Sequence, residues 1–244
     1  QPAKLKDPDF IEELRTLQAD LQIVGAFRML PEGVWAMPKL GTFNLHAALL
    51  PQYRGAAPIN WAIINGDTQT GITTFFLDHD IDTGNIIQRV PVPILDTDNA
   101  EDVHDKLMAL GSDLVIETVD NIIADNIHPI PQSAIETNEP LRPAPKIFKE
   151  TCRIDWNKSV KNTYDFIRGL SPYPAAWTEI TVNNKTSVLK IYATSKEFAT
   201  VEAPIGRILT DGKSYLKVAQ ADGYQNILTL QMAGKKRELD QRCP

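Results

Sequence analysis

Two polar side chains emerge on one face of an otherwise apolar segment, residues 42–46. Side chains two residues apart in a β-strand share a face, so Asn44 and His46 lie side by side, away from Phe43. Burying an amide and an imidazole without partners costs free energy, which indicates that a ligand or a reaction uses them. An amide can donate to a developing oxyanion, and an imidazole can relay protons near neutral pH. A purely structural polar pair remains the alternative.

An acidic loop follows a second strand-like segment further along the chain. Three carboxylates, Asp78, Asp80 and Asp82, fall within five residues. They could bind a metal, orient a histidine or form a solvated turn. Thr83 and Gly84 indicate a sharp bend that presents Asp82 inward.

Several common catalytic patterns are missing from the sequence. The chain contains no G-x-G-x-x-G, G-x-x-x-x-G-K-[ST], H-E-x-x-H or G-x-S-x-G motif, which argues against dinucleotide, phosphate-loop, zincin and serine-hydrolase functions. The two cysteines, Cys152 and Cys243, form no C-x-x-C pair, so we expect neither a disulfide framework nor a zinc knuckle. A reducing cytoplasm is the expected location.

The elements that position these residues alternate between helix and strand, which is typical of a parallel α/β sheet. A helix is expected from Asp98, with Glu101 completing a capping box, and Gly111 is a possible weak point in it. The other expected helices are a segment beginning at Pro8 and residues 31–37 and 58–65; the expected strands are 21–26, 42–46, 72–77 and 85–94.

The final hundred residues have a different pattern. One helix is expected at 160–170, followed by short alternating segments with hairpin turn signals such as Asp211-Gly212 and Asp222-Gly223. This pattern predicts a small β-barrel or sandwich. Its expected strands are 176–182, 187–193, 206–210, 215–219 and 226–232. We therefore predict a first domain at 1–137, a proline-containing linker at 138–145 and a second domain at 146–244.

Composition and charge fit a soluble two-domain protein. The 244 residues are 43% hydrophobic and 23% charged, and no apolar run approaches the ~18 residues that span a membrane. Residues 1–144 carry 9 Lys and Arg against 21 Asp and Glu, and residues 145–244 carry 16 against 10, which gives balances of −12 and +6. A basic second domain indicates a polyanionic partner, although a solvated surface is an equal alternative.

Several of these segments together resemble a known family. The segments are Asn44 to Pro51, Arg54 to Ile59 and Asp82-Thr83-Gly84 in the first domain, and Pro172 to Trp177 in the second. In combination they are similar to the methionyl-tRNA formyltransferase family. The chain departs from the family pattern at Ala48, Asn85 and Ala175, where serine, aspartate and glycine are usual.

The resemblance implies an α/β fold: a Rossmann-like formyltransferase domain followed by a small OB-like β-barrel. The family begins several tens of residues earlier than Gln1, so the first domain resembles an N-terminally truncated one. The first domain would carry the chemistry, and the basic second domain would bind tRNA.

The implied reaction moves a formyl group from 10-formyltetrahydrofolate to the α-amino group of methionyl-initiator tRNA. Asn44 and, when protonated, His46 would stabilise the oxyanion of the tetrahedral centre. His46 would also shuttle protons, and Asp82 would either hold the ring and stabilise the imidazolium or act through a bound water. No metal is required. The residues expected to line the folate site are Leu49, Leu50, Pro51, Asp78 and Asp80.

The expected partners are initiator methionyl-tRNA and the folate co-substrate, with no membrane contact and a monomeric chain. Lys235-Lys236-Arg237 is the best candidate for phosphate contact, with a charged hairpin end as the alternative. Arg54 would either place a substrate phosphate or pin its loop to a carboxylate. Two alternative functions remain. The first is another reaction on the same scaffold: formyl transfer to a sugar nucleotide or other small amine, or formyl-folate hydrolysis. The second is binding of RNA or folate without turnover.

Overall fold

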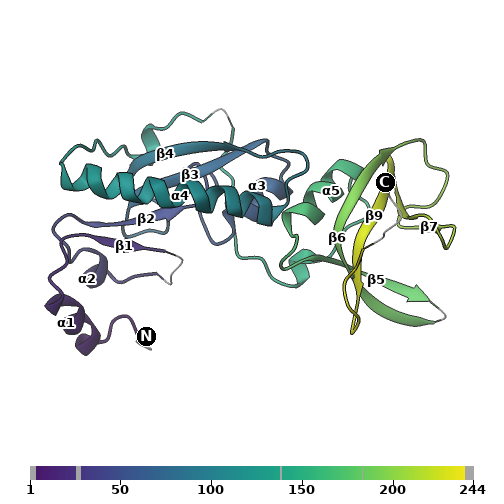
Figure 1. Cartoon of the computed structure of the whole chain (residues 1–244), viewed down its shortest axis with the longest axis horizontal. Coiled ribbons are helices and arrows are strands. Elements are labelled where there is room, and N and C mark those ends of the chain that lie inside the picture. The colour runs from purple at the N-terminus through teal and green to yellow at the C-terminus, as the bar shows by residue number, and fades with distance from the viewer. Residues whose placement is uncertain (1–3, 26–28, 138, 183, 240–244) are drawn as a thin grey trace. The chain divides into compact units, whose positions relative to one another are not determined.

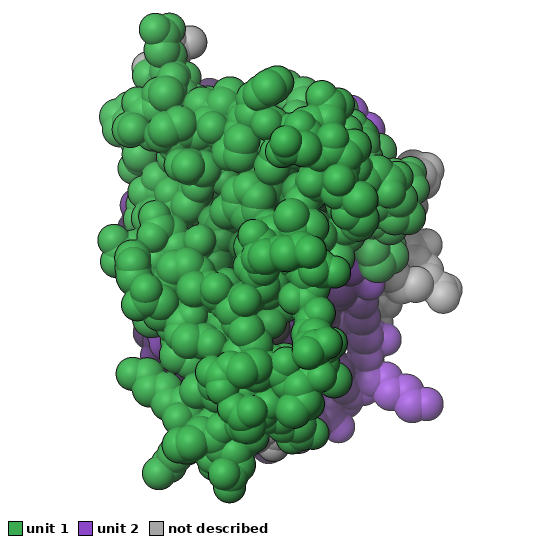
Figure 2. Space-filling view, turned by 90° about the vertical axis from the view of Figure 1, so that its left-hand side faces the viewer, with its two compact units in different colours: residues 1–58, 69–93, 105–145 green, residues 59–68, 94–104, 146–244 purple. Residues whose placement is uncertain are grey.

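The computed structural model describes residues 4–25, 29–137, 139–182 and 184–239. The chain divides into two compact units, shown in green and purple in Figure 2. Unit 1 contains residues 1–58, 69–93 and 105–145, and unit 2 contains residues 59–68, 94–104 and 146–244. Two short stretches from the first half of the chain therefore group with its C-terminal part.

Unit 1 is built on a four-stranded mixed sheet in the order β1-β2-β3-β4 (Figure 1). Its strands are β1 (Gln22–Val24), β2 (Thr42–His46), β3 (Gln69–Phe76) and β4 (Ile86–Pro93). Strands β1 and β2 are parallel, as the alternation of helix and strand up to residue 46 predicts, and β2–β3 and β3–β4 are antiparallel. The connection between β3 and β4 is too short for the crossover that parallel neighbours need.

Helical segments accompany or follow these strands. They are α1 (Pro8–Thr16), α2 (Glu32–Trp35), α3 (Pro58–Ile64), α4 (Ala100–Ile123) and the 3-10 turn η1 (Gln132–Ala134). Helix α1 begins as predicted, because the Asp7 side chain accepts a hydrogen bond from the Asp9 backbone N–H at 3.0 Å. No helix in the described ranges is long and apolar enough to cross a membrane.

The cap of α4 differs from the expected Asp98 and Glu101 pair. The Asn99 side chain accepts from the backbone N–H groups of Glu101 and Asp102, at 2.7 and 3.1 Å. Asp102 in turn accepts from the Asn99 N–H at 2.9 Å, which completes a capping box one residue later than predicted. Asp98 instead accepts from the backbone N–H of Leu95 at 2.7 Å.

Gly111 lies where α4 passes over the sheet of unit 1. A Cβ atom at this position would lie 2.7 Å from Cδ2 of Leu45 in β2, inside van der Waals contact. Gly111 therefore lets the helix approach β2 closely. On the other side of the sheet, Leu50, Phe75 and Ile86 form a buried apolar cluster.

Unit 2 contains a curled six-stranded antiparallel sheet in the order β5-β6-β9-β8-β7, with β10 paired to β9 (Figure 1). Helix α5 packs on this sheet through buried Ile167, against Ile191 and Ile227. The predicted fold class, an α/β domain followed by a small β domain, is confirmed. The elements are η2 (Glu150–Cys152), α5 (Val160–Gly169), β5 (Ala176–Val182), β6 (Lys185–Phe198), β7 (Ile208–Thr210), β8 (Leu216–Gln220), β9 (Gly223–Met232) and β10 (Glu238–Leu239).

One buried arginine explains why residues 94–104 belong to unit 2. The Arg168 guanidinium donates to the backbone carbonyls of Leu95 and Asp98, at 3.1 and 2.7 Å. It also donates to the buried carboxylate of Asp165 at 2.8 Å. These charge-assisted bonds tie the segment that leads into α4 to α5.

Candidate active site

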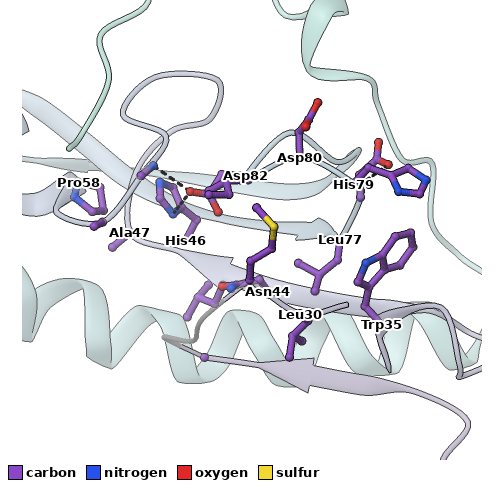
Figure 3. A pocket seen from close by; sticks show the side chains of 17 residues that line it. Leu30, Trp35, Asn44, His46, Ala47, Pro58, Leu77, His79, Asp80 and Asp82 are labelled. Carbon is purple, nitrogen blue, oxygen red and sulfur yellow. Dashed lines mark hydrogen bonds and ion pairs between the residues drawn. The ribbon is translucent and has the colours of Figure 1, made fainter. Parts of the chain in front are cut away.

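A cavity of about 480 Å³ opens in unit 1, where β2 ends and the loop after β3 passes over it (Figure 3). Cavities of this size are typical of small-molecule sites. Asn44, His46 and Asp82 line it together with apolar side chains such as Leu30 and Leu77. The structure therefore brings the three predicted catalytic residues together.

Strand β2 positions two of these residues by its alternation. Asn44 and His46 are 8% and 7% exposed and both face the cavity, whereas the preceding Phe43 is fully buried. The strand has the predicted bounds, because the alternation of side chains in 42–46 is unambiguous.

The hydrogen bonds of His46 fix the position of its ring proton. Nε2 lies 2.8 Å from the backbone oxygen of Tyr53. A carbonyl oxygen only accepts, so Nε2 carries the hydrogen and donates it. Nδ1 then faces Asp82, with 3.9 Å between Nδ1 and Oδ2 of the carboxylate. Nδ1 is therefore the atom of His46 that gains or loses a proton.

Burial lowers the pKa of His46 below its ordinary value, because desolvation disfavours the imidazolium. The carboxylate of Asp82 and the carbonyl of Tyr53 oppose this shift without cancelling it. The ring is thus neutral at neutral pH, with a vacant proton site at Nδ1. This arrangement suits a proton acceptor whose charged form is stabilised by a nearby acid.

Asp82 is held in an uncommon backbone conformation. Its φ of +56° lies in the left-handed region, and its side chain is 12% exposed. The carboxylate Oδ2 accepts from the backbone N–H of Gly55 at 2.9 Å, and Figure 3 shows the Asp82 side chain directed toward the His46 ring. The inward bend predicted from Thr83 and Gly84 is present.

The side-chain amide of Asn44 makes no hydrogen bond to any residue that the structure describes. It reaches the cavity from a strand that is otherwise paired on both sides. A buried amide without a protein partner is costly unless a ligand or water satisfies it. Its donor is therefore available to a bound substrate.

The residues expected to bind folate divide into two groups. Asp78 and Asp80 line the cavity from the loop after β3. Leu49, Leu50 and Pro51 are not among the described residues that line the cavity. Leu50 is fully buried in the apolar cluster with Phe75 and Ile86, where its side chain serves the core of unit 1.

Sequence reasoning missed further groups at the site. Trp35 forms part of the cavity wall and packs edge-on against His79, with 5.3 Å between ring centroids (Figure 3). His79 lines the same cavity with a side chain that is 68% exposed to solvent. The carbonyl of Tyr53 fixes the tautomer of His46 from a residue with φ +58°. A backbone group has no side-chain pattern that could have revealed it.

No group of three or more His, Cys, Asp or Glu side chains that could hold a metal ion occurs within the described ranges. The amide of Asn44, the imidazole of His46 and the carboxylate of Asp82 thus meet at a cavity that Asp78, His79 and Asp80 also line.

Two family models match the two parts of the chain. A family model described as formyl transferase matches residues 1–119, and one described as formyl transferase, C-terminal domain, matches residues 146–239. Methionyl-tRNA formyltransferase of Bacteroides thetaiotaomicron is 64% identical over 238 residues, covering 97% of this chain and 74% of that protein. The protein of the same name from Phocaeicola vulgatus is 72% identical over 222 residues, covering 90% and 68%.

Solved structures with the same fold are more distant in sequence. HypX from Aquifex aeolicus, in complex with tetrahydrofolic acid, aligns with a TM-score of 0.68 at 20% identity, covering 97% of this chain and 40% of that one. WlaRD, a sugar 3N-formyl transferase, aligns with a TM-score of 0.61 at 22% identity, covering 88% and 73%. The matches at high identity and the two family models lead to one conclusion: the chain belongs to the methionyl-tRNA formyltransferase family.

Proposed function

We propose that this protein transfers a formyl group from 10-formyltetrahydrofolate to the α-amino group of methionine on initiator tRNA. One observation carries the proposal: Nδ1 of His46 lies 3.9 Å from Oδ2 of Asp82, at a cavity that is also lined by Asn44, whose amide has no partner among the described residues. The relatives at 64% and 72% identity, both named methionyl-tRNA formyltransferase, support the same reaction.

Asn44 supplies electrostatic stabilisation in this proposal. Attack of an amine on a formyl carbon moves negative charge to the formyl oxygen. A preorganised amide N–H aimed at that oxygen stabilises it by about 3 kcal/mol. The amide of Asn44 meets this need because no described side chain competes for it.

His46 acts as the proton acceptor and donor. An α-amino group with a pKa near ~8 is partly neutral in the cell and attacks without prior deprotonation. The attacking nitrogen then loses a proton to Nδ1 of the neutral His46 ring, and Asp82 stabilises the resulting imidazolium. The same proton passes to the departing nitrogen as its bond to the formyl carbon breaks, which restores neutral His46.

The cavity fits the folate co-substrate by size and lining. Its volume of about 480 Å³ suits a ligand of that class, and Leu30, Trp35 and Leu77 offer apolar walls for a flat ring. When bound, 10-formyltetrahydrofolate supplies the formyl group. Asp78 and Asp80 lie in the loop at the rim, where a carboxylate can accept from an amino edge. HypX, which shares the fold, is described in complex with tetrahydrofolic acid.

The C-terminal domain is the proposed tRNA-binding part. Residues 145–244 carry 16 basic against 10 acidic side chains, and Lys235 and Lys236 are exposed beyond β9. Basic surfaces bind RNA through its phosphates. We place the reaction in the cytoplasm, on a monomeric protein that needs no metal.

A small-amine acceptor is the second candidate, because WlaRD shares the fold and is a sugar 3N-formyl transferase. At 22% identity this likeness concerns the fold alone. The relatives at 64% and 72% identity favour the tRNA acceptor.

A formylation assay tests the proposal. Purified protein is supplied with 10-formyltetrahydrofolate and either methionyl-initiator tRNA or a dTDP-linked amino sugar. We expect formyl-methionyl-tRNA from the wild type and from the surface control His128→Ala, and at least a roughly hundredfold loss in His46→Ala. Formylation of the sugar alone would overturn the tRNA assignment, and a fully active His46→Ala would overturn the site.

A further inference from the structure

Gln132 makes a set of hydrogen bonds beside the site that the proposed chemistry does not use directly. This residue begins η1 and is 4% exposed. Its Nε2 donates to the backbone oxygens of Asp82 and Gly84, at 2.8 and 2.9 Å. Its Oε1 accepts from Nε and Nη2 of Arg54, at 3.0 and 2.6 Å. Both donors and the acceptor of the amide are therefore occupied.

These bonds join the two loops that meet at Asp82. Arg54 is bonded to Gln132, and the next residue, Gly55, donates its N–H to the Asp82 carboxylate at 2.9 Å. The contacts thus form a closed ring. Arg54 bonds to Gln132, Gln132 bonds to the backbone of Asp82, and the Asp82 side chain bonds to Gly55, which follows Arg54 in the chain. One amide holds the backbone of the acid while the neighbouring loop holds its carboxylate.

Asp82 needs such support because its loop has little packing of its own. Residues 79–81 are exposed, and Asp82 itself has φ +56°. A residue with a left-handed backbone persists only where its surroundings determine it. The two bonds from Gln132 fall on both sides of the bend, at Asp82 and Gly84.

The contacts of Arg54 show one of its two expected roles. Its guanidinium donates from Nε and Nη2 to the amide oxygen of Gln132, and Arg54 is not among the described residues that line the cavity. Arg54 therefore pins its loop to an amide, where a carboxylate was expected.

We propose that Gln132 is a positioning residue that holds the Asp82 carboxylate opposite Nδ1 of His46, with Arg54 acting through it. The expected loss of kcat rests on the proposed function, whereas the positioning of Asp82 does not. Gln132 touches no reacting atom, so its effect passes through Asp82. Removing it should lower kcat and leave substrate binding largely intact.

The first test is a double-mutant cycle on kcat. Gln132→Met keeps the length and burial of the side chain and removes all four hydrogen bonds. We expect kcat to fall roughly tenfold to a hundredfold, with KM for either substrate nearly unchanged. In an Asp82→Asn background the same substitution should have little further effect, because coupled residues are not additive. Gln88→Met, at a glutamine of unit 1 bonded to Glu117 and Thr118, is the matched control.

The second test needs no turnover and therefore separates this proposal from the proposed function. The pKa of His46 is measured by NMR in protein with labelled histidine. Asp82→Asn should lower it in the wild-type background, because the carboxylate raises the pKa of His46. The decrease should be clearly smaller in the Gln132→Met background, where Asp82 is no longer held close.

The outcomes are distinct. Additive losses of kcat, or an equal pKa decrease in both backgrounds, would overturn the positioning role even if formylation is confirmed. An inactive wild type with the expected NMR result would overturn the proposed function alone. If Gln132→Met does not fold, Arg54→Met takes its place, because it removes two of the four bonds. In the Arg54→Met background, Asp82→Asn should also lower the pKa of His46 by less than it does in the wild type. An equal decrease in both backgrounds would count against the proposal.

Discussion

Nδ1 of His46 lies 3.9 Å from Oδ2 of Asp82, while Nε2 of the same ring donates to the carbonyl of Tyr53 at 2.8 Å. The two contacts give the two ring nitrogens different roles. One nitrogen is a fixed donor that orients the ring, and the other is the site of proton exchange. Because the ring is buried, it is neutral at rest, and the carboxylate of Asp82 partly offsets the cost of charging it when Nδ1 accepts a proton.

The first prediction concerns the pH dependence of the reaction. The pKa of His46 lies below its ordinary 6.5, so kcat/KM, divided by the fraction of the substrate α-amine that is neutral, should be constant near neutrality and fall as the pH drops through that lowered value. Below it Nδ1 already carries a proton and cannot accept another. Asp82→Asn removes a group that raises this pKa, so the acid limb should move to lower pH while kcat falls.

Rate profiles between about pH 5 and 8 measure both effects. Asp113→Asn replaces an exposed carboxylate on α4 and should leave the profile unchanged. An acid limb of Asp82→Asn at higher pH than the wild type would show that Asp82 does not act on His46 by its charge.

The second prediction concerns the amide of Asn44, which has no partner in the part of the chain that the structure describes. Asn44→Ala should lower kcat about 10²–10³-fold with little change in KM, because the oxyanion exists only along the reaction path. Asn44→Asp keeps the shape but places a negative charge beside the developing one, so its kcat should be lower still. Asn126→Ala, at an exposed position of unit 1, is the control. A raised KM with unchanged kcat would instead assign Asn44 to ground-state binding.

Part of this site could be predicted because it follows from local geometry. The alternation in 42–46 placed Asn44 and His46 on one face, and β2 has those bounds. The glycine after Asp82-Thr83 indicated the bend at Asp82, whose φ is +56°. In each case the evidence lay within a few consecutive residues.

The rest depends on contacts between distant segments or on backbone groups. Tyr53 acts through its carbonyl, and Gln132 reaches Asp82 from fifty residues further along the chain. Leu50 illustrates a different difficulty, because an apolar residue fits a ligand cleft and a core equally well, and here it lies in the core.

The third prediction concerns Gly84, whose carbonyl accepts from Gln132. A Cβ atom at this position would lie 1.7 Å from the backbone oxygen of Phe76, so a side chain cannot be added without moving the strand end or the loop. Gly84→Ala should cost about 2 kcal/mol or more of the free energy of unfolding and displace Asp82. Thermal unfolding temperature and kcat should therefore both fall.

Gly33→Ala is the matched control, because nothing lies within 4 Å of a Cβ atom at that position in α2. Its Tm should be unchanged or slightly higher, since alanine is the better helix former. Wild-type stability in Gly84→Ala would contradict the close approach to Phe76.

The last prediction concerns the exposed lysines beyond β9. The double variant Lys235→Ala, Lys236→Ala should bind methionyl-initiator tRNA more weakly than the wild type. The slope of log Kd against log salt concentration should also decrease, by up to about 0.7–0.9 for each phosphate that these lysines neutralise. Arg237 is left in place because its guanidinium lies 4.0 Å from the centre of the Tyr192 ring, so replacing it would also disturb packing. Lys39→Ala, at a lysine of unit 1 paired with Asp20, should change neither affinity nor slope. Binding measured over a salt series separates the outcomes, since an unchanged slope in the double variant would place the phosphate contacts elsewhere on the basic domain.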